Sequence, residues 1–301
     1  MHSLASVIFL AIPSEVIWSY FVGGAVFAIG TAVIFLRGDW QKARGLDKLI
    51  VFGPVFYAAP VAAFGTEHFT LTAAVASIIP AWIPWHIAWV YFLGACFIAA
   101  ALSVVTGIQA RFSASMLALT FFLFVALMHG PGWAQDPGNR FALAVALREL
   151  SFSGGALALA VSLSDKGRRT DIFAVIARYL VAVPVLFFSV EQFLHGDHVP
   201  GVPLNRLTPE YIYGHAIWTY VAAVAYAVAG ILLVSGKKTR AAATWLGAMV
   251  LFVELVVYVP IGVVDRASLA TGLNYVADTL MFCGAVLLLA GAMPREAQSR
   301  D

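Results

Sequence analysis

The sequence predicts an all-α polytopic membrane protein with about nine transmembrane helices, eight of them arranged as two parallel four-helix bundle repeats. A high apolar content, a series of membrane-length apolar windows and a recurring register predict this fold. Apolar residues make up 61% of the 301 and charged residues only 11%, whereas a soluble domain carries about 25% charged residues. The formal net charge of +2 does not favour a nucleic-acid partner, and the expected partner is the lipid bilayer.

The apolar windows are long enough to cross the hydrocarbon core as helices, which takes about 20 residues. They cover residues 14–36, 49–66, 84–106, 111–130, 141–163, 172–193, 211–235, 240–260 and 272–292. Each window must be helical because a segment in lipid has to satisfy its own backbone hydrogen bonds. Residues 4–12 are expected either to extend the first helix or to lie at the membrane interface.

Lysine and arginine are distributed unevenly between the two sides of the membrane that these windows define. If the N-terminus is outside, 14 of the 18 basic residues lie on the inner side and only 4 on the outer side. Cytoplasmic loops carry the excess of basic residues. We therefore expect a protein of the cell inner (plasma) membrane, bacterial in type, with its N-terminus outside and its C-terminus in the cytoplasm.

A motif of the form His-x-x-Trp-x-Tyr occurs twice, starting at His86 and again 129 residues later at His215. Further pairs share this register: Glu149 with Asp278 and Gly155 with Gly284 at an offset of 129, and Glu67 with Glu191 at an offset of 124. The change of five in the offset indicates one insertion in the outer loop between these two parts of the unit.

The register divides the chain into two homologous units. Residues 45–164 form the first four-helix unit and residues 171–293 the second, with an extra helix and loop in residues 1–44 and a cytoplasmic tail in residues 294–301. Because each unit has an even number of spans, both enter the membrane in the same direction, which predicts parallel repeats.

Several motifs in these units resemble the DoxX-like family of four-helix membrane proteins. They are FGTEHF at 64–69, FSVEQF at 188–193, and SGKKTRAAATWLGAMVL at 235–251 with its weaker copy TGIQARFSASMLALT. The resemblance covers nearly everything after residue 45, although this chain fuses two units and adds a helix. The family includes the small membrane subunit of thiosulfate:quinone oxidoreductase. The resemblance therefore implies a redox-associated subunit that binds a quinone or a similar apolar ligand, together with a redox partner protein.

Ionisable side chains within the spans are the candidate ligand-binding residues, because they are costly in lipid and should face the bundle interior. A histidine can bond a quinone carbonyl and also titrate near neutral pH. We expect one outer-half pocket per unit, built from His86, Glu67 and Glu149 in the first and from His215, Glu191 and Asp278 in the second. The remaining candidates are Trp89, Trp218, Arg148, His129 and Glu254.

Other interpretations of the same residues stay open. The carboxylates and Arg148 could form a structural ion network, and the tryptophans could form an interfacial belt. His195, Asp197 and His198 form a weak candidate metal patch. The alternative functions are binding or transport of a metal ion or haem, with His86, His129 and His215 as candidate ligands, and a non-catalytic structural or assembly subunit. The sequence leaves open whether the protein is an enzyme, because it carries no soluble catalytic motif in a suitable context.

Overall fold

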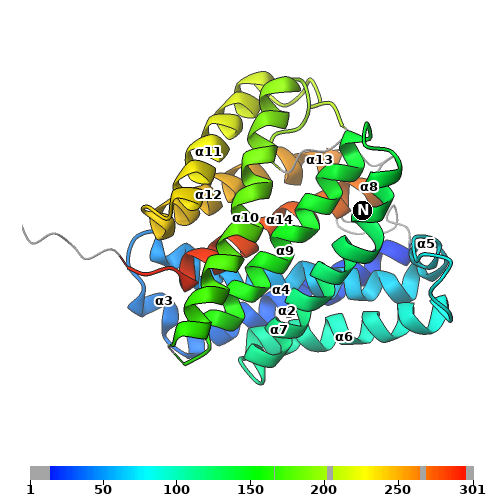
Figure 1. Ribbon diagram of the computed structural model, residues 1–301, viewed down its shortest axis with the longest axis horizontal. Helices are drawn as coiled ribbons and strands as arrows, with labels where there is room; N and C mark the ends of the chain where they lie inside the picture. The colour runs from blue at the N-terminus through cyan, green and yellow to red at the C-terminus, as the bar shows by residue number, and fades with distance from the viewer. Residues whose placement is uncertain (1–13, 166, 202–205, 265–268, 296–301) are drawn as a thin grey trace, which may run out of the picture.

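The architecture of the chain is helical throughout its described part. A computed structural model describes residues 14–165, 167–201, 206–264 and 269–295 (Figure 1). Within these ranges the chain forms no β-strand, and nine helical segments are long and apolar enough to cross a membrane. The predicted all-α membrane fold is therefore confirmed. The expectation for residues 4–12 falls outside the described residues.

The helices follow the predicted order of one extra helix and two sets of four. The extra helix is α2 (Ser14–Leu36). The first set is α4 (Asp47–Thr70), α6 (His86–Thr106), α7 (Ala110–Phe124) and α9 (Arg140–Ser162). The second set is α10 (Arg168–Leu194), α11 (His215–Ser235), α12 (Thr239–Val253) and α14 (Leu269–Ala292). Short helices in the connections are α3 (Asp39–Lys42), α5 (Thr72–Ser77), α8 (Gly130–Gln135) and α13 (Val259–Val264).

The backbone repeats the register found in the sequence. The bounds of α6 and α11 differ by 129 residues at both ends, and so do those of α7 and α12. Both α7 and α12 continue into a five-residue π-helix at the same offset, η1 (Val125–His129) and η2 (Glu254–Tyr258). Gly107 and Gly236 end α6 and α11 with φ of 77° and 73°, a left-handed conformation that glycine adopts without steric cost.

The two sets of helices pack against each other at the centre of the bundle (Figure 1). The first helix of each set packs against the last helix of the other set, α4 against α14 and α10 against α9. The two last helices, α9 and α14, also pack against each other, while α2 covers α4 and α6. The most buried spans are consequently α4, α9 and α14, so polar groups on α9 and α14 lie where the two units meet.

Two matched glycines allow this close packing. A Cβ added at Gly284 of α14 would meet the backbone of Tyr57 on α4, and one added at Gly155 of α9 would meet Ala285 on α14. Small residues let membrane helices approach closely, which is a main source of helix association in lipid. The Tyr57 hydroxyl spans the same region and donates a 2.9 Å hydrogen bond to the carbonyl oxygen of Phe152.

Candidate functional site

The first unit contains a cavity of about 270 Å³ near the end of the bundle where α4 ends. Helices α4, α6, α7 and α9 contribute to its walls, as do η1, the α5 region and α14 of the second unit. Ile78 lines this cavity and is nevertheless 60% exposed. The cavity therefore reaches the molecular surface beside α5.

Most of the wall is apolar and aromatic. Phe97 stacks on Phe121 at 5.6 Å between ring centroids and meets Phe124 edge-on at 6.2 Å. Leu93, Met128 and Val145 extend this apolar surface. Such a wall suits a flat apolar ligand, because aromatic rings prefer offset stacking or edge-to-face contact.

One side of the cavity is polar and joins the two units. Arg148 of α9 forms an ion pair with Asp278 of α14, with 2.5 Å between Nη1 and Oδ2. The two side chains are only 13% and 10% exposed. Glu67 and Glu149 line the same space. A buried ion pair of this kind is stable only if the remaining donors and acceptors of both groups are satisfied.

Two polar atoms on this side of the cavity, one from Arg148 and one from Glu149, have no hydrogen-bond partner in the described part of the structure. Nε of Arg148 and Oε2 of Glu149 are buried without a hydrogen bond. Leaving a buried donor or acceptor unpaired costs about 1–3 kcal/mol, and more for charged groups. Both residues line the cavity, so a ligand bound there would lie beside these two side chains.

Two histidines add further polar chemistry. His68 lies on α4 with Nδ1 2.7 Å from the carbonyl oxygen of Phe64, so Nδ1 donates and Nε2 is left as an acceptor in the neutral ring. His129 ends η1 and also lines the cavity. π-Helical segments are uncommon and frequently occur at functional sites.

The cavity brings together five of the sequence-predicted site residues in a different grouping from the expected one. Glu67, Glu149, Arg148, His129 and Asp278 share it. The reason is the central crossing of α9 and α14, which carries Asp278 into the first unit rather than to Glu191. His68 and Asn274 also line it, although the sequence reasoning did not select them. The internal repeat does not indicate either residue, because the counterpart of His68 is Gln192 and that of Asn274 is Val145.

The remaining predicted residues of the first unit lie away from this cavity. His86 begins α6 one turn before Val90, which is the first α6 residue to line it. Trp89 is 42% exposed and packs against Phe92 at 5.9 Å between centroids. This exposed position fits the alternative interpretation as part of an interfacial belt.

The second-unit candidates are likewise separated from one another. Glu191 pairs with Arg140 through Nε of the arginine. Trp218 donates from Nε1 to the carbonyl oxygen of Tyr213 at 3.0 Å. Glu254 is 3% exposed, and neither of its carboxyl oxygens has a hydrogen-bond partner in the described part of the structure. The side chain of His215 lies outside the described residues.

The candidate metal patch has hydrogen-bond partners of its own. His198 Nδ1 lies 2.8 Å from Oδ1 of Asp197, and the rings of His195 and His198 are 5.4 Å apart. The hydrogen bond from His198 lowers the pKa of the exposed Asp197 carboxyl. Across the described residues, no group of three or more histidine, cysteine or carboxylate side chains is arranged to hold a metal ion.

In the second unit, the region that corresponds to this cavity is occupied by packed side chains. Cavity residues Phe124, Met128 and His129 correspond to Val253, Val257 and Tyr258. These three pack in a buried apolar cluster with Val199 and Ile212 of the loop at 195–214. That loop is five residues longer than its counterpart at 71–85. Val199 and Ile212 of this longer loop thus pack into the region.

Replacing Ile212 by alanine tests this packing. Ile212 is 6% exposed, and its truncation should lower the free energy of unfolding by about 2 kcal/mol through lost contacts and a residual cavity. Leu207 of the same loop is 60% exposed, so its alanine variant should be nearly neutral. Denaturant unfolding in detergent micelles measures both. Equal effects of the two substitutions would contradict a filling role for Ile212.

Comparison with models of known protein families, with curated proteins and with solved structures finds no match for this chain.

Proposed function

We propose that the protein binds a quinone, or a ligand of the same shape and polarity, in the first-unit cavity. One observation carries the proposal: an aromatic cavity inside the bundle is lined by Arg148 and Glu149, and each has a buried polar atom, Nε and Oε2, that lacks a hydrogen-bond partner among the described residues. A quinone carbonyl accepts a hydrogen bond from the first of these atoms. A quinol hydroxyl donates to the second. The volume of about 270 Å³ lies just below the usual range for drug-sized ligands, about 300–1,000 Å³, and suits one ring.

The carboxyl groups give the site a role in proton transfer under this proposal. Reduction of a quinone to a quinol takes two electrons, which a redox partner protein supplies, and two protons. Glu149 and Glu67 both line the cavity and can pass protons to the ligand oxygens. The opening beside Ile78 gives a membrane-dissolved ligand a route into the cavity.

The proposal also includes the membrane side on which the cavity lies and the kind of protein beside which this subunit works. The cavity lies at the end of the bundle where α4 ends at Thr70, three residues beyond Glu67, and the asymmetry of 14 against 4 basic residues supports an orientation with that end outside the inner membrane. The resemblance to the DoxX-like family supports a subunit that works beside a redox enzyme.

Filling the cavity provides a sharp test of ligand binding. Leu93 lines the cavity, and a tryptophan there should occupy the space of the ring and abolish binding of decylubiquinone to the purified protein. Leu119 lies on α7, is 50% exposed and does not line the cavity, so Leu119→Trp should bind normally. Isothermal titration in detergent compares the two variants with the unmodified protein.

The polar contact is tested separately by Glu149→Gln. Loss of a charge-assisted hydrogen bond of about 1.5–3 kcal/mol should weaken binding by at least tenfold. Glu210 is exposed, and Glu210→Gln serves as the control for the change in charge. If the unmodified protein binds no quinone, or if Leu93→Trp binds as well as Leu119→Trp, the proposal is wrong and a purely structural role for the polar cluster is supported.

A further inference from the structure

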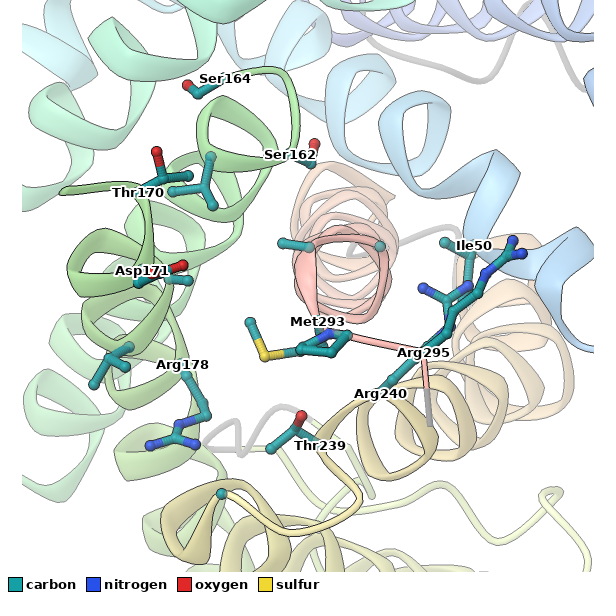
Figure 2. Close-up of a pocket in the computed structure, with 17 residues that line it drawn as sticks. Ile50, Ser162, Ser164, Thr170, Asp171, Arg178, Thr239, Arg240, Met293 and Arg295 are labelled. Carbon is teal, nitrogen blue, oxygen red and sulfur yellow. The ribbon is translucent and has the colours of Figure 1, made fainter. Parts of the chain in front are cut away.

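A second and larger pocket, of about 910 Å³, lies at the opposite end of the bundle. It is bordered by the last turns of α9 and α14 and by the first turns of α10 and α12. Its position makes it independent of the quinone cavity. Figure 2 shows Met293 at its centre, with α10 on one side and α12 on the other.

Three arginines border this pocket: Arg178, Arg240 and Arg295. Arg240 donates to Asp47 at 2.8 Å, and Arg295 lies 3.5 Å from the same carboxylate. Asp171, on the first turn of α10, is the one carboxylate among the described residues that line the pocket. With Asp47 counted because it pairs with two of these arginines, three positive and two negative charges leave a net charge of +1, which complements a phosphodiester.

Arg178 is the least neutralised of the three arginines. It forms no ion pair with a carboxylate in the described part of the chain, and its buried Nε has no hydrogen-bond partner there. Its guanidinium lies 5.1 Å from the ring of Tyr179 and against Gly236, where an added Cβ would be 2.5 Å from Nη1. The glycine therefore leaves room for this guanidinium beside the end of α11.

The start of α12 faces the same space. Figure 2 shows Thr239 between Arg178 and Arg240 along one edge of the pocket. Thr239 begins this 15-residue helix, and no side chain caps the helix end. The first backbone N–H groups of a helix have no intrahelical partners and favour anions, phosphate above all. A guanidinium, a hydroxyl and uncapped N–H groups are thus gathered on one edge.

The rest of the pocket is apolar. Ile50, Val161, Val175 and Met293 line it, and these side chains suit the glycerol and upper acyl chain of a lipid rather than a free ion. Basic pockets between transmembrane helices on the cytoplasmic side bind the head groups of anionic lipids. The pocket lies at the end of the bundle that holds most of the basic residues.

We propose that this pocket binds the phosphate group of an anionic phospholipid, with Arg178 and the start of α12 as its contacts. Inorganic phosphate shares this chemistry but cannot use the apolar wall. The lipid is therefore the expected occupant.

The test measures binding of phosphatidylglycerol, phosphatidylcholine and inorganic phosphate to the detergent-purified protein, by native mass spectrometry for the lipids and by thermal unfolding for all three. Phosphatidylglycerol should bind and raise the unfolding temperature more than the zwitterionic lipid does. Arg178→Gln should weaken its binding about tenfold, as expected for loss of one charged hydrogen bond. Arg178→Lys, which keeps the charge, should lose less.

Arg37, which follows the extra helix α2 and lies against the end of α6, supplies a matched control. Arg37 donates to the carbonyl oxygen of Thr106 at 2.6 Å beside Gly107, at the end of α6, much as Arg178 lies beside Gly236. Arg37 does not line the pocket, and the counterpart of Thr239 is Ala110. Arg37→Gln should therefore leave lipid binding unchanged.

Four outcomes decide the proposal. Equal binding of both lipids, or an Arg37→Gln loss equal to that of Arg178→Gln, would overturn it. Stabilisation by inorganic phosphate as large as that by phosphatidylglycerol would support the phosphate contact and assign the site to the free ion. If Arg178→Gln does not fold, Thr239→Ala replaces it, because Thr239 begins α12 and lines the pocket, and unchanged binding in that variant would also count against the proposal.

Discussion

Replacing Gly284 by leucine is expected to lower the free energy of unfolding by about 3 kcal/mol, the upper part of the usual range for overpacking. Gly284 packs directly on the backbone of Tyr57 and Phe56, and backbone cannot move aside as a flexible side chain can. The substitution should separate α14 from α4 and loosen the contact between the two units. Denaturant unfolding in micelles measures the change.

Gly24 of α2 is the matched control for this prediction. A Cβ added there would meet no atom within 4 Å, so Gly24→Leu should be neutral or slightly stabilising, since leucine has a higher helix propensity than glycine. Gly155→Leu should resemble Gly284→Leu, because Gly155 packs against Ala285 in the same way. A Gly284→Leu protein as stable as Gly24→Leu would show that the central crossing is not close-packed.

Local sequence patterns were sufficient to predict the helices. The predicted window 84–106 corresponds to α6, His86–Thr106, and 211–235 corresponds to α11, His215–Ser235. The end of α4 was placed too early, at residue 66, although the helix runs to Thr70. The polar Glu67 and His68 do not end it, since a backbone in lipid must keep its hydrogen bonds internal. The π-helices η1 and η2 gave no sequence signal that distinguishes them from α-helix.

The grouping of the site residues depended on tertiary contacts that local pattern does not contain. The repeat correctly matches Glu149 with Asp278, yet it cannot tell whether each carboxylate stays within its own unit. The crossing of α9 and α14 decides this, because it brings both residues to one cavity. His68 shows the reverse limitation. It lies beside Glu67 in the motif FGTEHF, and the repeat does not mark it as a site residue because its counterpart is Gln192.

Asp278→Ala is expected to reduce the free energy of unfolding by about 3–5 kcal/mol, the range for removing one partner of a buried ion pair. The substitution leaves the Arg148 guanidinium, whose side chain is 13% exposed, without its ion-pair partner. The pair Lys42–Asp39 provides the contrast, because its side chains are 73% and 43% exposed. Asp39→Ala should therefore change the stability by less than about 1 kcal/mol.

A double replacement separates the charge from the packing. If the loss in Asp278→Ala arises from the unpaired arginine, then Arg148→Met combined with Asp278→Leu should recover most of the stability, since apolar substitutes for a buried ion pair are often neutral or stabilising. The same double variant should bind quinone poorly, because Arg148 Nε is no longer present. A variant that is stable yet does not bind would indicate that the ion pair is retained for the ligand. If the double variant regains both stability and quinone binding, the Arg148–Asp278 ion pair has no role in the site. If it regains neither, the ion pair is a structural link between α9 and α14.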